Sequence, residues 1–262
     1  MSSTADVVDY SGVTEVLGSR VTPEALSMLY TRYTFAATLA EGRDVLEVAC
    51  GGGPGLGYLA QRARRVVGGD YTASLLVQAA RHYHGRIPLV RFDAQGLPFR
   101  AASFDAVLLY EALYYLAEPG QFVREAARVL RRPGRVIIST VNREWSDFIP
   151  SALSTRYFSG RELVSLLGQQ GFETTLYGAF PVSRASAKHR AVSMIRRTAA
   201  QLHLVPPTMK GKELLKRFFL GRLVVFPAEV AAAMAPYGSP VRLDAEAPIR
   251  DFKVLFAVGQ KG

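Results

Sequence analysis

The chain has 262 residues, enough for one large domain or for a core domain with an appended subdomain. Hydrophobic residues make up 49% and charged residues 21%, a balance that excludes a disordered chain. The single cysteine, Cys50, excludes an internal disulfide framework and a zinc site built from several cysteines. The net charge of +10 indicates anionic partners such as nucleic acid, lipid or an acidic substrate.

The sequence also bears on location. The first ten residues contain neither a basic segment nor an apolar one, so we expect no signal peptide. No apolar run reaches the length of about 18 residues that a membrane-spanning helix needs without interruption by charge or proline. We therefore expect a cytoplasmic protein.

Strand-like and helix-like segments alternate along the chain. The predicted helices cover 23–39, 72–83, 121–130 and 159–167, and the predicted strands cover 44–49, 65–68, 88–92, 104–110, 135–141, 172–182 and 251–258. Alternation at this spacing predicts βαβ units, hence an α/β fold with a Rossmann-like parallel sheet covered by helices on both faces. In such sheets ligands bind at the carboxyl ends of the strands.

The first of these strands runs directly into a glycine-rich segment. Residues 45–57 read V-L-E-V-A-C-G-G-G-P-G-L-G. Glycines at the end of a strand let backbone N–H groups approach a nucleotide-type ligand, although a tight turn is the simpler alternative. The dinucleotide pattern G-x-G-x-x-G fits in no frame. G-x-G-x-x-A fits only at 55–60, too late if the helix begins at Gly51.

The spacing of Glu47, Ala49, Gly51 and Gly53 resembles motif I of the class I S-adenosylmethionine (AdoMet)-dependent methyltransferases. Ala49 departs from the family pattern, which often has glycine there. The resemblance implies that the loop passes the methionine part of AdoMet, and that Glu47 orders the loop and its bound waters.

Further segments resemble the same family. Asp70, at the end of the second strand, would accept both ribose hydroxyls, a role that NAD would also allow. Tyr71 would lie against the adenine edge, or is simply a strand-end aromatic. The segment R-F-D-A-Q-G-L-P-F at 91–99 implies that Asp93 accepts the adenine amino group and that the Ala94 N–H reaches a ring nitrogen. The alternative for Asp93 is a helix cap.

Four more residues follow from the resemblance, on the acceptor side and in the leading helix. Tyr110 would flank the sulfonium, since an aromatic face favours a cation. Glu111 and Tyr114 are candidates for the acceptor pocket, with a helix-start acid and a core aromatic as alternatives. Arg32, in T-R-Y-T-F-A, would pair with the cofactor carboxylate, or is a solvated helix arginine.

The resemblance implies a seven-stranded, mostly parallel sheet with an antiparallel last strand, AdoMet as the cofactor and no metal. Methyl transfer requires no nucleophilic residue, because the cofactor supplies the reactive group. His189 is a candidate general base.

The last two strands are separated by an unusually long insertion. We expect three parts: a core at 1–182, a basic helical lid for substrate recognition at 183–250, and a final core strand at 251–262. The lid helices are predicted at 186–204 and 211–219, with a merely stabilising appendage as the alternative. Residues 184–222 hold ten basic residues and one acid, Glu213, so nearly all the excess charge lies in this insertion.

These features together favour an AdoMet-dependent methyltransferase of biosynthetic or secondary metabolism that methylates oxygen, nitrogen or carbon of a small, apolar or anionic molecule. A D-P-P-Y-type segment is absent after the fourth strand, where L-Y-E-A stands, which argues against a nucleic-acid substrate. Three alternatives stay open. They are a methyltransferase for a membrane-associated lipid or quinone, docked by peripheral membrane contact of the basic insertion; an NAD-dependent oxidoreductase; and an AdoMet-fold protein whose basic helices mainly bind a membrane, RNA or a partner. The oligomeric state is open.

Overall fold

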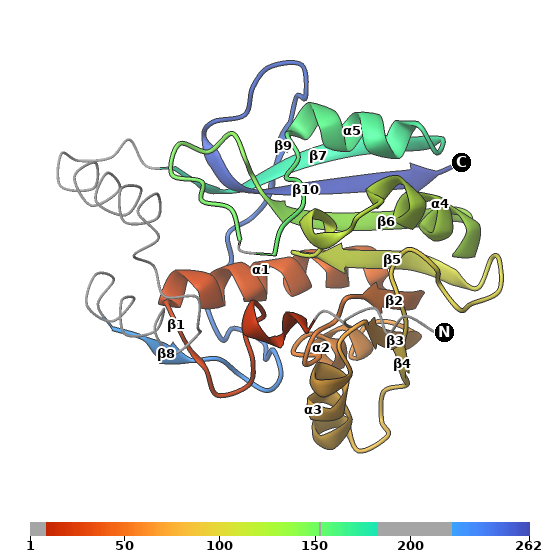
Figure 1. Ribbon diagram of the computed structural model, residues 1–262, viewed down its shortest axis with the longest axis vertical. Helices are drawn as coiled ribbons and strands as arrows, with labels where there is room; N and C mark the ends of the chain where they lie inside the picture. The colour runs from red at the N-terminus through yellow and green to blue at the C-terminus, as the bar shows by residue number, and fades with distance from the viewer. Residues whose placement is uncertain (1–8, 152, 183–221) are drawn as a thin grey trace, which may run out of the picture.

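The computed structural model describes residues 9–151, 153–182 and 222–262, and it has an α/β architecture (Figure 1). The helices are α1 (Pro23–Ala40), α2 (Leu56–Ala60), α3 (Ala73–Tyr83), α4 (Pro119–Val129) and α5 (Gly160–Gly168), with the 3-10 turns η1 (Tyr10–Gly12) and η2 (Leu113–Tyr115). The main sheet is built from β2 (Asp44–Val48), β3 (Arg65–Asp70), β4 (Leu89–Arg91), β5 (Phe104–Tyr110), β6 (Leu130–Val141), β7 (Phe172–Pro181), β9 (Val241–Leu243) and β10 (Phe252–Lys261).

The eight strands lie in the order β4-β3-β2-β5-β6-β10-β7-β9. Strands β2 to β6 are mutually parallel, and β10 runs antiparallel to both of its neighbours. The predicted mostly parallel Rossmann-like sheet with an antiparallel last strand is therefore confirmed. The prediction lacked β9, an eighth strand that pairs antiparallel with β7. It is three residues long, too short to show a period in sequence.

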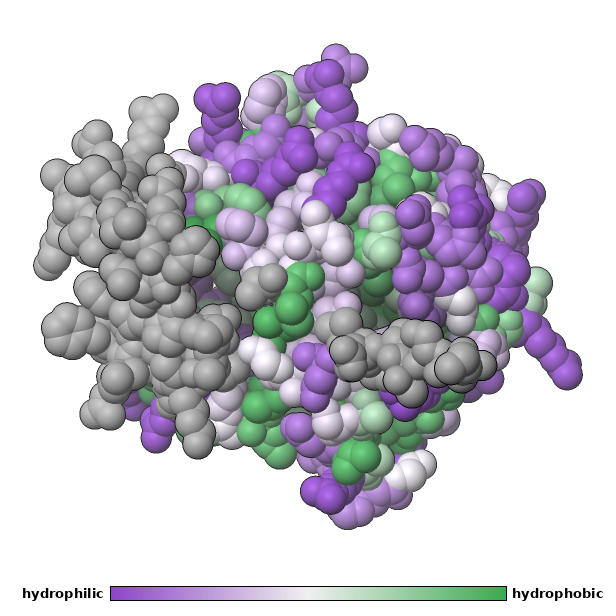
Figure 2. All heavy atoms as spheres, viewed as in Figure 1, coloured by the Kyte–Doolittle hydropathy of each residue, from purple (hydrophilic) through white to green (hydrophobic). Residues whose placement is uncertain are grey.

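Alternation along β5 explains why helices cover both faces of the sheet. Val107 and Leu109 belong to the apolar cluster under α4 and α5, whereas Ala106 and Leu108 belong to the cluster under α1, α2 and α3. All four are fully buried. On the face shown in Figure 2, hydrophilic side chains dominate over α4 and α5, so these helices turn their polar sides outward.

A second, two-stranded sheet joins distant parts of the chain. β1 (Arg20–Val21), just before α1, pairs antiparallel with β8 (Val224–Val225), which follows the long insertion. The N–H of Phe226 donates to the carbonyl of Ser19 at 2.8 Å, and the N–H of Gly18 donates back to the carbonyl of Phe226. The segment that follows the insertion is thus hydrogen-bonded to the segment that precedes α1.

Only the end of the insertion predicted as a lid at 183–250 is described, from residue 222 onward. Residues 222–250 form β8, β9 and irregular segments without a helix, because short valine-rich stretches here pair with existing strand edges. The predicted lid helices at 186–204 and 211–219 lie outside the described residues. No helix within the described ranges has the length and hydropathy needed to span a lipid bilayer.

A mutation that creates a cavity tests whether alternate residues of β5 are packed against helices on opposite faces of the sheet. Leu108→Ala should lower the free energy of unfolding by about 2–5 kcal/mol, because a fully buried leucine leaves a cavity that the sheet cannot close. Chemical denaturation measures this change. Val77→Ala, on the exposed side of α3, is the control and should change the free energy by less than about 0.5 kcal/mol. If both variants lost the same free energy of unfolding, the proposed burial of Leu108 between the sheet and its helices would be contradicted.

Candidate active site

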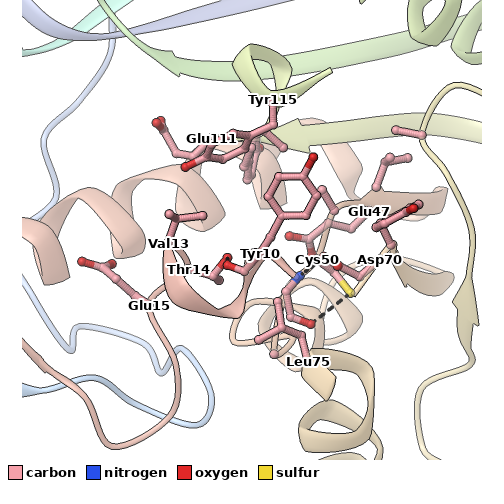
Figure 3. Close-up of a pocket in the computed structure, with 18 of the residues that line it drawn as sticks. Tyr10, Val13, Thr14, Glu15, Glu47, Cys50, Asp70, Leu75, Glu111 and Tyr115 are labelled. Carbon is pink, nitrogen blue, oxygen red and sulfur yellow. Dashed lines mark hydrogen bonds between the residues drawn. The ribbon is translucent and has the colours of Figure 1, made fainter. Parts of the chain in front are cut away.

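A cavity of about 490 Å³ opens at the carboxyl ends of β2, β3 and β5, where the parallel sheet was expected to bind a ligand (Figure 3). It brings together most of the residues singled out in the sequence, namely Arg32, Glu47, Ala49, Gly51, Asp70, Tyr71, Asp93, Ala94, Tyr110, Glu111 and Tyr114. Gly53 is not part of the lining, and His189 lies outside the described residues.

The loop after β2 has a backbone that few sequences can adopt. Ala49, Gly51 and Gly53 have φ angles of 57°, 57° and 74°, in the left-handed region. A Cβ on Gly53 would lie 2.9 Å from the Leu56 side chain, so glycine is also required sterically. These left-handed residues prevent a helix, and the expected helix start at Gly51 is wrong: α2 begins at Leu56.

Asp70 connects the ends of β2 and β3. Its Oδ2 accepts the N–H of Gly51 at 2.8 Å and its Oδ1 accepts the N–H of Thr72 at 2.7 Å. Burial raises the pKa of Asp70, while these backbone donors oppose the rise. Each carboxylate oxygen keeps a further lone pair, which is compatible with the predicted ribose contact. Asp70 therefore also holds the glycine loop, which sequence reasoning missed.

Glu47 is buried behind the loop and is paired differently from the expectation. The Tyr33 hydroxyl donates to its Oε1 at 2.5 Å, whereas Oε2 is buried without a hydrogen-bond partner in the described structure. Burial raises the pKa of Glu47 to about 8. The ring of Tyr33 also fills the space where a Cβ of Gly55 would stand, so α1 fixes the loop from the other side.

Arg32 and Glu111 form an ion pair in the lining of the cavity. Arg32 Nη2 lies 3.1 Å from Glu111 Oε1, so the alternative of a solvated helix arginine is wrong. Burial opposes its charge, but the neighbouring carboxylates outweigh burial and raise the pKa of Arg32. Ser139 donates to Glu111 Oε1 and Tyr114 donates to Glu111 Oε2, both at 3.2 Å. Glu111 is held in the left-handed region, with φ of 51°.

The segment after β4 lines another side of the cavity. Asp93 Oδ1 accepts the N–H of Gln95 at 2.8 Å, and the N–H of Gly96 donates to the Asp93 carbonyl. This is a turn and not a helix cap, so that alternative for Asp93 is wrong. Tyr71, 36% exposed, lies at the rim.

Sequence reasoning missed the residues before β1 that line the cavity. They are Tyr10, Val13, Thr14 and Glu15. The Tyr10 ring lies 5.3 Å from that of Tyr115 and 6.2 Å from that of Tyr71, and Figure 3 shows it pointing toward Tyr115. A three-residue 3-10 turn has no sequence period. The capping Asp9, which accepts the N–H of Ser11, was the one available signal.

Within the part of the chain that the structure describes, the lining carries more acid than base. Five carboxyl groups face the cavity there (Glu15, Glu47, Asp70, Asp93 and Glu111), against one guanidinium, that of Arg32. AdoMet has a sulfonium and an ammonium for one carboxylate, so its net positive charge suits this lining. The buried Oε2 of Glu47, without a partner in the described structure, also requires a hydrogen-bond partner from a ligand or water. These groups fit AdoMet.

Comparisons with known proteins agree with this geometry. Residues 46–138 match the sequence family described as a methyltransferase domain. Those residues form a class I AdoMet-dependent methyltransferase domain. Its cofactor is AdoMet, as the motifs indicated, and not NAD.

Individual relatives support the methyltransferase domain and its fold. A probable S-adenosylmethionine-dependent methyltransferase of Mycolicibacterium smegmatis is 36% identical over 145 residues, 54% of this chain and 56% of the relative. A fatty-acid O-methyltransferase of the same organism is 39% identical over 117 residues, 44% of this chain and 42% of the relative. The chain thus spans about half the length of these relatives. The fold matches a crystal structure of a SAM-dependent methyltransferase from Thermotoga maritima with a TM-score of 0.60, at 15% identity and 92% coverage of both chains.

The support of the glycine loop by Tyr83 is testable. Its hydroxyl donates to the Gly53 carbonyl at 2.6 Å and accepts the N–H of Gly57 at 3.0 Å. Tyr83→Phe leaves the Gly57 N–H without its partner and leaves the Gly53 carbonyl with only the N–H of Leu56 at 3.2 Å, so the free energy of unfolding should fall by about 1–3 kcal/mol in chemical denaturation. Tyr58→Phe, which removes a 3.4 Å contact with Thr34 and an interaction with the Tyr30 hydroxyl, should cost less. A Tyr83→Phe variant as stable as the wild type would contradict a stabilising role of the Tyr83 hydroxyl in the glycine loop.

The pKa of Glu47 predicts a pH-dependent stability. The folded state holds a proton on Glu47 up to about pH 8, whereas the unfolded chain releases it near the ordinary pKa of 4.5. The folded state binds more protons in this window, so the contribution of Glu47 to stability falls as the pH rises through it. Glu47→Gln removes this dependence. The free energy of unfolding of the variant relative to wild type should therefore increase between about pH 5 and pH 8. If the difference in the free energy of unfolding between Glu47→Gln and the wild type stayed the same across this range in denaturant titrations, the predicted effect of Glu47 would be excluded.

Proposed function

We propose that the whole chain is an AdoMet-dependent methyltransferase that acts on a small-molecule acceptor. The observation that carries the proposal is the acid-lined cavity at the strand ends, bordered by the left-handed glycine loop and reached by Tyr114 and Glu111. The relatives with methyltransferase names support it for the domain that they share with this chain.

Each cofactor-facing residue receives a role in this proposal. Asp70 accepts ribose hydroxyls while keeping its bond to the Gly51 N–H. Asp93 and the Ala94 N–H recognise the adenine edge beside Tyr71, as the family resemblance implies. Ala49, Gly51 and Gly53 shape the loop beside the methionine portion, and Glu47 offers its unpartnered Oε2 to a donor there. Tyr110 lies beside the sulfonium, and Arg32 provides the positive charge of the lining.

The protein contributes mainly alignment and proton transfer. Bound AdoMet supplies an electrophilic methyl group, so the chain needs no nucleophile of its own. Holding the acceptor in line with the methyl group removes much of the entropic part of the barrier. Glu111 and Tyr114 stand where they can receive a proton from the acceptor. His189 remains a further candidate base.

A second candidate is a methyltransferase for a membrane-associated lipid or quinone. The concentration of ten basic residues within 184–222 favours it, because anionic lipid attracts such a segment. Apolar character of the acceptor, peripheral membrane contact and a cytoplasmic location belong to the proposal in either form.

Titration with AdoMet tests the proposed function. Asp70→Ala should weaken AdoMet binding by more than about tenfold, since two charge-assisted hydrogen bonds contribute roughly 1.5–3 kcal/mol each. Isothermal titration calorimetry measures the affinity, and circular dichroism verifies that the variant folds. Asp251→Ala, at an exposed position, is the matched control and should leave the affinity unchanged. Tight binding of NAD without binding of AdoMet would contradict the proposed function.

A further inference from the structure

Among the described residues, the side of the cavity lined by Glu15, Glu111 and Tyr114, where the proposed function places the acceptor, has an excess of negative charge. Glu15 and Glu111 line it together with Arg32, and Arg32 is already paired with Glu111 at 3.1 Å. Glu15 also lies close enough to favour the charged form of Arg32. One guanidinium therefore serves two carboxylates before any ligand arrives. A ligand carboxylate placed here would be a third anion around one cation, in a partly buried site where charges are weakly screened.

The same groups form a route for a proton. Tyr114 donates its hydroxyl proton to Glu111 Oε2 at 3.2 Å, and the oxygen of this hydroxyl can accept one in return. Burial and the neighbouring Glu111 raise the pKa of Tyr114 well above its usual value, so it stays a neutral hydroxyl. Stacking of its ring on Tyr157, with centroids 4.4 Å apart, fixes the hydroxyl beside the cavity.

We propose that the acceptor is a hydroxyl or an amine, whose nucleophilic atom carries a proton, and that the cavity rejects a carboxylate. The inference deepens the proposed function and rests on it. It also replaces the expectation of an anionic acceptor. A carboxylate has no proton to give to Tyr114 and meets the charges of Glu15 and Glu111, whereas a hydroxyl or amine uses both features.

The step is balanced without a further reactant. As the acceptor atom bonds to the methyl carbon, the carbon–sulfur bond breaks and its electron pair remains on sulfur. The proton of the acceptor moves to Tyr114 Oη, and Tyr114 passes its own hydroxyl proton to Glu111 Oε2. Glu111 then releases that proton to water. Arg32 and Ser139 hold the Glu111 carboxylate in place throughout.

The aromatic lining sets the choice of probe. Tyr10, Tyr114 and Tyr115 border this side of the cavity, so flat aromatic molecules are suitable. The test uses 2-naphthol, 2-naphthylmethylamine and 2-naphthoate, which differ mainly in the polar group. Each is titrated into the full chain saturated with S-adenosylhomocysteine, at about pH 7 and at about 50 mM and 200 mM salt.

We expect 2-naphthol or the amine to bind at least about tenfold more tightly than 2-naphthoate at low salt, and this ratio to shrink at high salt. Glu15→Gln should reduce the ratio to about threefold, because it removes the unpaired carboxylate. Glu41→Gln, at the exposed end of α1, removes a charge away from the cavity and should leave the ratio unchanged.

The outcomes separate the two proposals. If S-adenosylhomocysteine itself fails to bind the wild-type chain, the proposed function fails. If it binds normally and 2-naphthoate binds as tightly as 2-naphthol and the amine, only the acceptor inference is overturned. Failure of all three probes to bind the loaded protein also overturns it. S-adenosylhomocysteine affinity in Glu15→Gln, measured first, shows that the variant is folded.

Discussion

The two hydrogen bonds that Asp70 accepts hold together the part of the molecule where a ligand can bind. Parallel strands expose their carboxyl ends at one edge, but nothing in a sheet fixes the loops that leave it. Asp70, at the end of β3, accepts the N–H of Gly51 from the neighbouring loop and the N–H of Thr72 from its own. Because the carboxylate is buried, these donors are its main compensation for lost water. The loop, the cavity and the ligand contacts all follow from this attachment.

Around this attachment the site combines strained backbone with unusual charge. The left-handed residues Ala49 and Glu111 follow two adjacent strands of the sheet, and both line the cavity. Such conformations persist only where surrounding contacts determine them. Tyr33 fixes the first region from α1, and the ion pair with Arg32 fixes the second. A single helix thus braces both sides of the cavity, the side of the glycine loop and the side of the acceptor.

The segment that follows the long insertion, from residue 222 onward, contacts this part of the molecule. β8 pairs with β1, and Phe226 lines the same cavity as Tyr10 and Glu15. The N–H of Val230 donates to the carbonyl of Pro54 in the glycine loop. A hydrogen bond of 2.8 Å between His82 Nε2 and Glu229 Oε2 also joins α3 to this segment. The base of the insertion is therefore in direct contact with the cofactor loop, so changes there are expected to reach the cavity.

The sequence by itself determined the parallel core of the sheet, the position of the glycine loop and most charged groups of the described lining, because apolar periodicity and strand-end acids are local features. Asp70, Asp93 and Glu111 could be selected for that reason. Only the tertiary structure decided which groups pair: Glu47 with Tyr33, Arg32 with Glu111, and the short strands β1, β8 and β9 with distant edges. These contacts join residues far apart in sequence and leave no periodic trace, so only burial and geometry reveal the acid excess of the described lining.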